Sequence, residues 1–296
     1  MFQMEDVKRL PFANYDILVY LGVGILALPI AREFVIIPLG LTLPVVTAAT
    51  DSAFVRAAFE TLYLLFTGYA LGHVIAYVSS YFIERFIHEW LRYPSDVWLS
   101  LGNRRGATRF SVFNSNINTT EISLASLLTG LFHFPLWPLY ALVHASDSFG
   151  FYTPKLDSAF LQPVRDKVVK LGIPTPVTHR SKWAKSLEHY VANNSALGYT
   201  RLYNYLVIFG VLRSLAFILV ALSWVKLLAL FVDVNRVTNG SISAVILHKP
   251  LPADLVGYVG ISGFAALTVM AFGKFNRRFF EECVYAFIMT HDERIR

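Results

Sequence analysis

The side chains that could do chemistry in this chain gather in GHVIAYVSSYFIERFIHEW, residues 72 to 90, at the end of a long apolar stretch. Ser80, Glu84 and His88 follow His73 at offsets of 7, 11 and 15 residues. At about 100° per helical residue, these offsets place all four side chains within about 60° of one direction. The spacing predicts a polar stripe on a helix, which is either a site or the wetter side of a packed helix.

Arg213, in a later apolar stretch, is the fifth member of this polar set. His73 and Arg213 each lie about ten residues into their apolar segments, so at 1.5 Å per residue both would be about 15 Å deep. Glu84 is the natural counter-ion for Arg213. Two interpretations stay open: an ion pair that locks two helices together, with His73 hydrogen-bonded to a neighbour, or a functional site.

Motifs for metal or nucleophilic chemistry are missing from the sequence. Glu84 and His88 stand four residues apart and could aim at one metal ion, with His73 or His133 as a third ligand. However, the chain has no H-E-x-x-H and no CxxC motif. It also has no G-x-S-x-G motif, and GNRRGAT at 102 to 108 lacks the Walker lysine. We therefore expect no metal, no cofactor and no catalytic residue, and a non-enzymatic protein.

Basic clusters and a glycine series indicate the partners. The cations that could hold a phosphate are Arg104, Arg105, Arg109, Lys274, Arg277 and Arg278. Anchoring to anionic lipid at the cytoplasmic face is the favoured interpretation, and nucleic acid is not expected. Gly257, Gly260 and Gly263 recur every three residues, which suits close helix contact within or between subunits. We expect a homo-oligomer.

The elements that carry these residues belong in a membrane. The chain is 55% hydrophobic and only 16% charged, whereas soluble domains are about 25% charged. Its single cysteine, Cys283, excludes an intrachain disulfide, and the first residues lack the pattern of a signal peptide. A span needs about 20 apolar residues. The predicted spans are 15 to 31, 61 to 83, 203 to 230 and 254 to 273, with 34 to 49 and 122 to 143 left open.

Charge asymmetry decides the orientation. If 122 to 143 does not cross, 20 of the 26 Lys and Arg residues lie on the side of the termini and two on the other. Cytoplasmic loops are enriched in Lys and Arg, so we expect a multi-pass inner-membrane protein with both termini in the cytoplasm. Crossing by 122 to 143 would move eight basic residues and remove the bias. This segment is therefore interpreted as a re-entrant, interfacial or buried hairpin.

The predicted fold is all-α, a polytopic membrane protein with about four transmembrane helices. Residues 157 to 171 and 181 to 198 have helical spacing, and Asn239-Gly240 between β-prone flanks predicts a small external hairpin. The predicted regions are two spans in 1–83, a mainly helical cytoplasmic insertion in 84–202, two spans in 203–273 with the external hairpin at 231–252, and a cytoplasmic tail in 274–296.

Three stretches resemble a loose group of uncharacterised bacterial inner-membrane proteins: FANYDILVYLGVGILAL (12 to 28), GYALGHVIAYVSSYFIERFIHEWLRYPSD (68 to 96) and RLYNYLVIFGVLRSLAFILVAL (201 to 222). The resemblance covers about half of the chain and brings no activity. It implies a bacterial polytopic protein in which Gly72, His73, Ser80, Glu84 and Arg213 match recurrent polar positions.

Three functions are consistent with these features. The first is an oligomeric pore, channel or membrane effector, by analogy one of bacterial defence, controlled through the insertion 84–202 by a protein partner or a small-molecule signal. The second is a membrane-embedded enzyme that acts on lipid with His73, Glu84 and His88. The third is a structural anchor for a partner complex.

Overall fold

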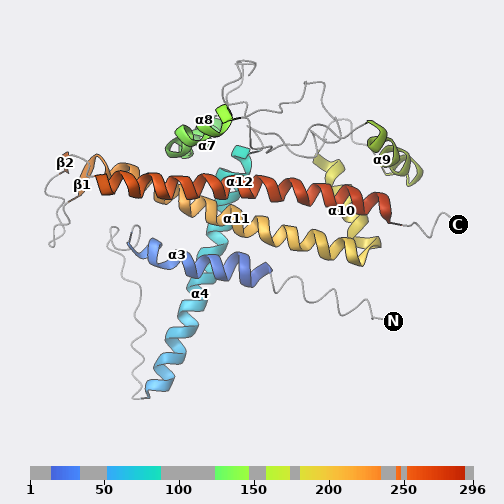
Figure 1. The fold of residues 1–296 in the computed structure, drawn as a ribbon. Helices are drawn as coiled ribbons and strands as arrows, with labels where there is room; N and C mark the ends of the chain where they lie inside the picture. Colours follow the sequence, from blue (N-terminus) through green and yellow to red (C-terminus); the bar gives the residue numbers. More distant parts are fainter. Residues whose placement is uncertain are drawn as a thin grey trace.

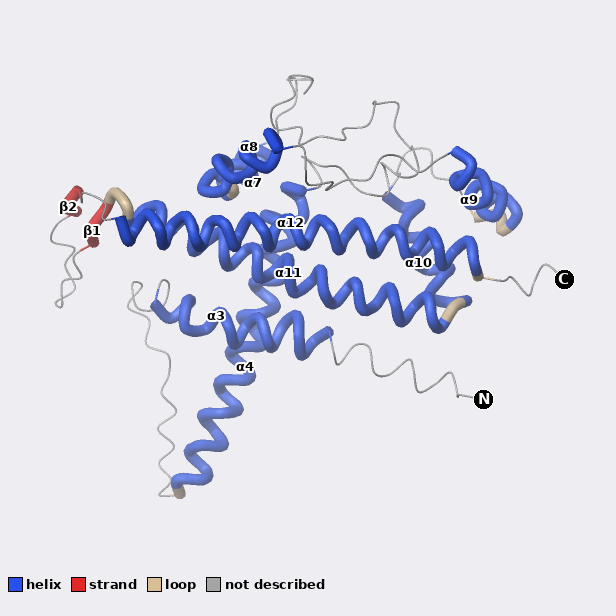
Figure 2. Tube along the Cα trace, in the orientation of Figure 1, coloured by secondary structure: helices blue, strands red, loops and turns tan. Residues whose placement is uncertain are grey.

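The computed structural model describes residues 15–33, 52–87, 124–146, 158–173, 181–234, 245–247 and 252–290, and these are almost entirely helical (Figures 1 and 2). Two long antiparallel helices, α11 (Ala196–Ala229) and α12 (Pro252–Met289), lie side by side and form the axis of the molecule. Helix α4 (Ala53–Ser79) crosses this pair, and α3 (Val23–Ala31) lies against α4. The helical class of the fold agrees with the sequence-based prediction.

Within the described residues, three helices, not the predicted four, are long and apolar enough to cross a membrane. They are Ala53–Ile87, Ala196–Ala229 and Pro252–Met289, of 35, 34 and 38 residues. The predicted first span forms only the shorter apolar helix Asp16–Ala31, which begins with the π-helical turn η1 (Asp16–Gly22). A hydrocarbon core of about 30 Å needs about 20 helical residues. The count of four spans is therefore not supported, and 34–49 lies outside the described residues.

Helices α11 and α12 are longer than a bilayer requires. At 1.5 Å per residue their 34 and 38 residues extend about 51 and 57 Å. Both helices run through the boundaries predicted at 202/203 and 273/274, so a described helix continues from the apolar region into the basic one. The predicted helix 181 to 198 is instead broken at Ser195, where the backbone is extended and the side chain accepts a hydrogen bond from Gly198 N.

The first half of α4 has no neighbour among the described residues. Its first buried residue is Gly68, and Phe54 and Phe66 before it are 82% and 72% exposed. This half projects away from the rest of the molecule (Figure 1). The second half continues through the π-helical turn η3 (Ser80–Glu84) into the main core.

Glycines set the distance between α3 and α4. A Cβ atom at Gly24 would lie 1.7 Å from the carbonyl oxygen of Gly68, and one at Gly72 would lie 1.9 Å from that of Tyr20. No side chain fits at these separations, so the backbones touch as in G-x-x-x-G helix pairs of membrane proteins. The sequence GYALG at 68–72 supplies this surface, and the close contact positions Tyr20 beside His73.

The main core joins the end of α4 to α11 and α12. Ile83, Phe86 and Ile87 belong to the same buried cluster as Ala216 and Phe272. A smaller cluster joins α3 to α4 and α11 through Val23, Ala27, Ile75 and Ile218. The crossing region is therefore held by apolar contacts from four helices.

Shorter elements cover the two ends of the α11–α12 pair (Figure 1). Near one end lie α7 (Leu124–Phe132), the turn η5 (Phe134–Leu136) and α8 (Trp137–Ser146), and near the other lie α9 (Ser158–Lys170) and α10 (Ser181–Asn194). Strands β1 (Val232–Val234) and β2 (Val245–Leu247) pair antiparallel. The turn predicted at Asn239-Gly240 lies outside the described residues, so the external hairpin stays a prediction.

Candidate functional site

The polar residues of α4 meet those of α11 at the crossing of the two helices. Nη1 of Arg213 lies 2.5 Å from Oε2 of Glu84, and the two side chains are 13% and 31% exposed. The π-helical turn at Ser80–Glu84 has more residues per turn than an α-helix and so changes the direction of the residues that follow it. The counter-ion predicted for Arg213 is thus its partner in the structure.

This ion pair links two helices, but it does not satisfy the whole guanidinium group. The Nε atom of Arg213 is buried and has no hydrogen-bond partner in the described protein. Removing a charge from water costs several kcal/mol unless a partner and hydrogen bonds compensate for it. Loss of either partner would therefore leave a costly charge at the crossing.

The similar depths of His73 and Arg213 would have allowed the two side chains to meet, but His73 contacts tyrosine rings instead. Its ring stacks on Tyr20 of η1 with a centroid separation of 3.8 Å, and the edge of Tyr69 packs against it at 4.5 Å. His73 and Glu84 are 11 residues apart on one helix, which corresponds to about 16 Å along its axis. They cannot serve as acid and base on one reacting group.

Two tyrosines that the sequence interpretation missed bridge this gap. Tyr20 stacks on His73, and the edge of Tyr15 packs against Tyr20 at 5.4 Å. The hydroxyl of Tyr15 lies against α11 about one turn before Arg213, because a Cβ atom at Gly210 would be 3.2 Å from it. An α-helix would point residues five apart about 140° away from each other, whereas π-helical geometry brings them to one side.

Of the remaining residues of the stripe, Ser80 is among the described residues and His88 is not. Ser80 Oγ donates to the carbonyl oxygen of Tyr77 at 2.7 Å, a common arrangement for a serine within a helix. Among stripe neighbours, Tyr69 is 38% and Tyr77 80% exposed, so the described chain leaves this face of α4 open. His88, Arg104, Arg105 and Arg109 lie outside the described residues.

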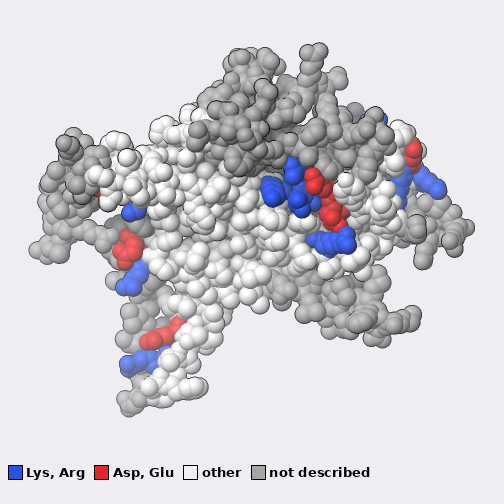
Figure 3. All heavy atoms as spheres, viewed as in Figure 1, with Lys and Arg blue, Asp and Glu red and all other residues white. Residues whose placement is uncertain are grey.

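The basic residues after the last apolar stretch lie on the C-terminal half of α12. Lys274 and Arg278 are exposed, and Arg277 pairs with Glu281 at 3.2 Å. Figure 3 shows Lys, Arg, Asp and Glu side chains gathered over this half, whereas the other half of the pair is mainly uncharged. This division suits a helix that leaves the hydrocarbon region near residue 273.

The glycine series of α12 does not face another described helix closely. A Cβ atom added at Gly257, Gly260 or Gly263 would meet nothing within 4 Å. The glycines whose backbones touch another helix are Gly24 of α3 and Gly68 and Gly72 of α4, which the prediction did not name as packing residues. Contact between subunits through Gly257, Gly260 and Gly263 stays a prediction.

A lysine joins the insertion 84–202 to the end of α12. The ammonium group of Lys167 in α9 donates to the carbonyl oxygens of Phe287 (2.6 Å) and Thr290, and it lies 5.4 Å from the ring centre of Tyr190 in α10. The last carbonyl groups of a helix lack partners and carry partial negative charge, so a cation stabilises them. Three helices therefore meet at Lys167.

Nearby on α10, Glu188 is partly buried between the helices. Burial raises the pKa of its carboxyl group above the ordinary value, and the neighbouring charges of His189 and Lys185 oppose this effect. The protonated form of Glu188 is thus favoured by packing of α10.

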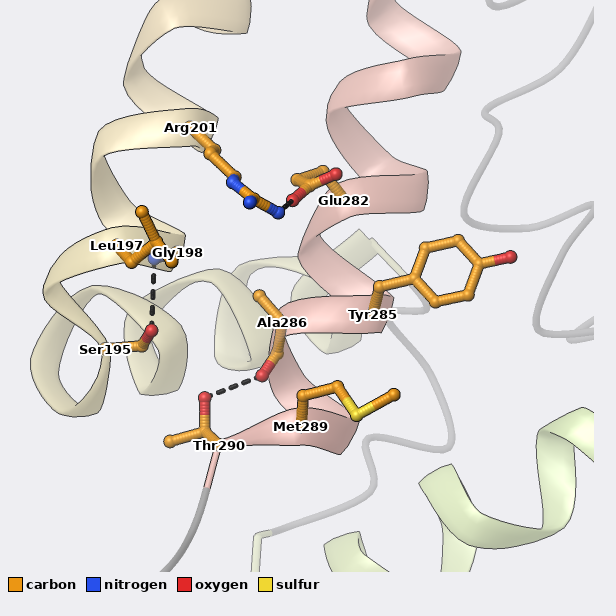
Figure 4. Close-up of a pocket in the computed structure, with 9 residues that line it drawn as sticks. All are labelled: Ser195, Leu197, Gly198, Arg201, Glu282, Tyr285, Ala286, Met289 and Thr290. Atoms are coloured by element: carbon orange, nitrogen blue, oxygen red, sulfur yellow. Dashed lines mark hydrogen bonds and ion pairs between the residues drawn. The ribbon is translucent and has the colours of Figure 1, made fainter.

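A pocket of about 260 Å³ opens where α11 begins and α12 ends (Figure 4). Its polar groups are already paired: Arg201 contacts Glu282 at 2.9 Å, Gly198 N donates to Ser195 Oγ at 3.0 Å, and Thr290 Oγ1 donates to the Ala286 carbonyl oxygen at 2.6 Å. The pocket therefore presents few unsatisfied groups to a ligand.

Within the described ranges, no group of three or more His, Cys, Asp or Glu residues is placed to hold a metal ion. No protein-family model, curated protein or solved structure matches this chain. The class that the structure supports is a helical membrane protein with three helices able to span a bilayer. The resemblance to bacterial inner-membrane proteins stays a prediction.

Proposed function

We propose that this chain is a subunit of an oligomeric inner-membrane pore, channel or membrane effector, by analogy one of bacterial defence. The observation that carries the proposal is the open face at His73 and Ser80, beside the exposed Tyr69 and Tyr77, whereas Glu84 pairs with Arg213 at the next turn. Ionisable side chains at hydrocarbon depth face protein or water and not lipid. A second subunit or a water-filled path would therefore cover this stripe.

The insertion 84–202 supplies the control in this proposal. Lys167 and the packing of α10 couple the insertion directly to the end of α12, the longest of the candidate spans. A protein partner or a small-molecule signal that displaced α9 would remove the cation from the terminal carbonyl groups. Because α12 is continuous from Pro252 to Met289, a shift at its end would be transmitted toward the membrane.

The orientation in this proposal follows the charge distribution. Both termini and the insertion lie in the cytoplasm, where the exposed cations Lys274 and Arg278 contact anionic lipid headgroups. Oligomerisation would use the open apolar and glycine surfaces of α4 and α12.

A cysteine-accessibility experiment tests the proposal. Ser80→Cys and His73→Cys are made in a chain with Cys283→Ala and reconstituted in liposomes. Val74→Cys is the matched control, because Val74 is adjacent to His73, is 58% exposed and points about 100° away. A charged, membrane-impermeant thiol reagent should modify positions 73 and 80 and change ion flux, while position 74 stays protected.

Two results would contradict the proposal. One is equal protection of positions 73, 74 and 80, and the other is ion flux no greater than in empty liposomes when the reagent does react. Glu84→Gln then separates the alternatives. Lost assembly supports a structural anchor, changed conductance with intact assembly supports a pore, and lost lipid turnover with intact assembly supports an enzyme.

The anchor is the second candidate, because the pair of Glu84 and Arg213 ties α4 to α11 as a structural ion pair would. The enzyme has less support. The separation of about 16 Å between His73 and Glu84 along α4 rules out their joint action on one atom.

A further inference from the structure

Helices α7 and α8 form a hairpin that is too short to cross a bilayer. They have 9 and 10 residues, or about 15 Å each, and are joined at His133 and the turn η5. A chain that turns within hydrocarbon exposes backbone carbonyl groups, and each must find a protein partner. The hydrogen-bond partners of this turn therefore indicate whether it lies in water or in hydrocarbon.

The two candidate spans α11 and α12 donate to the turn. Nε1 of Trp224 donates to the carbonyl oxygen of Phe132 at 2.8 Å, and the hydroxyl of Tyr258 donates to that of Pro135 at 2.7 Å. Both acceptors belong to the bend, where the regular helical pattern is interrupted. Side chains of the two candidate spans thus donate the hydrogen bonds that water would donate to a turn at the protein surface.

His133 adds a third tie, to the end of α4. The ring is fully buried and stacks on Phe86 at 3.8 Å. Its Nε2 lies 3.2 Å from the carbonyl oxygen of Phe82, which can only accept, so Nε2 carries the hydrogen. Nδ1 then accepts from the hydroxyl of Tyr140 at 3.0 Å. The histidine is held neutral, as a group inside an apolar medium should be.

The ties place the turn at membrane depth. Trp224 lies five residues before the end of α11 at Ala229, and Tyr258 lies six residues after the start of α12 at Pro252. Both belong to the apolar halves of these helices, away from α9 and α10. A hairpin that enters from the side of the insertion would have to reach deep into the bilayer to make these contacts.

The outer face of the hairpin is apolar and is left exposed by the described residues. Leu124, Leu127, Leu128 and Leu131 are 72%, 59%, 44% and 55% exposed and occupy one helical face. Phe134 and Trp137 continue this surface at 47% and 38% exposed. The turn beside this surface contacts the uncharged half of the α11–α12 pair through Trp224 and Tyr258, so one apolar medium would cover both.

We infer that Leu124–Ser146 is a re-entrant hairpin that dips into the bilayer and returns to the same side, with its leucine face in contact with lipid hydrocarbon. This inference rests on the membrane placement in the proposed function, but not on a pore. The hairpin is held by spans α4, α11 and α12 through neutral hydrogen bonds. It leaves the basic insertion on one side of the membrane.

Fluorescence quenching in proteoliposomes tests this inference. Leu127→Cys and Leu131→Cys, each in the Cys283→Ala chain, carry a small environment-sensitive fluorophore. Lipids with a nitroxide on the acyl chain should quench both labels several-fold more than aqueous iodide does. Val169→Cys on α9, also an exposed apolar position at 77%, should show the reverse.

A label at Val259→Cys on α12, a position that is 51% exposed, tests the membrane placement separately from the re-entrant hairpin. If position 259 is quenched by nitroxide lipid but positions 127 and 131 respond like position 169, the re-entrant hairpin is wrong and the membrane placement stands. If position 259 also responds only to iodide, the membrane placement itself fails. Protection of positions 127 and 131 from both quenchers would mean that a second copy covers the face, which also overturns lipid contact.

Discussion

Replacing Gly72 with alanine would place a methyl group where the backbone of α3 now lies. The added carbon would be 1.9 Å from the carbonyl oxygen of Tyr20. Ordinary contacts between such atoms are about 3.5 Å, so α3 and α4 would have to separate by more than about 1 Å. The stacking of Tyr20 on His73 could not survive this movement unchanged.

The expected loss of stability follows from two opposing terms. Overpacking costs about 1–3 kcal/mol, and the upper end applies here because the obstacle is backbone. Alanine regains up to about 1 kcal/mol of helix propensity over glycine. A net loss of about 2 kcal/mol would accelerate local opening of the α3–α4 contact by about 30-fold.

Thiol labelling in detergent measures this opening. Ala76 is 5% exposed and lies one helical turn beyond Gly72, so Ala76→Cys in a Cys283→Ala chain is protected until the helices part. The labelling rate with a neutral maleimide is compared with and without Gly72→Ala. Gly257→Ala is the matched control, because nothing lies within 4 Å of its added carbon.

The reasoning predicts fast labelling with Gly72→Ala and an unchanged or slower rate with Gly257→Ala. Equal rates in the parent chain and in Gly72→Ala would refute the close approach of α3 and α4. Acceleration of the same size by both substitutions would mean that any alanine in these spans has the effect, and the geometric argument would fail.

Three further perturbations address the crossing and the insertion. Arg213→Met and Glu84→Gln should each destabilise the protein by a few kcal/mol, and the double variant should lose less than the sum; additive losses in thermal unfolding would show that the pair is not coupled. Lys167→Met should weaken the packing of α9 on α12 by about 1–2 kcal/mol and speed hydrogen exchange in α9, whereas substitution of the exposed Lys170 by Met should not. Equal protection from exchange in both variants would show that Lys167 does not stabilise the terminal carbonyl groups of α12. Because burial raises the pKa of Glu188 above its ordinary 4.5, the folded state binds a proton more tightly than the unfolded state, so stability should fall as pH rises through the range above 4.5. Glu188→Gln should flatten that slope in melting curves, and a slope identical to that of the parent chain would contradict this assignment.

The sequence was sufficient to predict the apolar segments that are long enough to cross a bilayer and the isolated charges within them, because both depend only on local composition. Three of the predicted spans correspond to helices of sufficient length, and Glu84 was identified as the partner of Arg213. The helix at 157 to 171 was also predicted within a residue at each end, and in the structure Gly172, with a φ of 63°, follows its last turn. The predicted first span, 15 to 31, coincides with the helix Asp16–Ala31, but this helix is shorter than the about 20 residues that a span needs.

Only the tertiary structure decided which polar residues meet. Similar depths allowed His73 to share a layer with Arg213, but the backbone contact of Gly72 with Tyr20 places the His73 ring against tyrosine rings. Tyr15 and Tyr20 join one face through π-helical geometry, which a period of 3.6 residues cannot reveal. Trp224 and Tyr258 reach the turn of α7 and α8 across 92 and 123 residues of sequence. Sequence patterns describe the two faces of one helix, whereas contacts between helices depend on the angle and distance at which the helices pack.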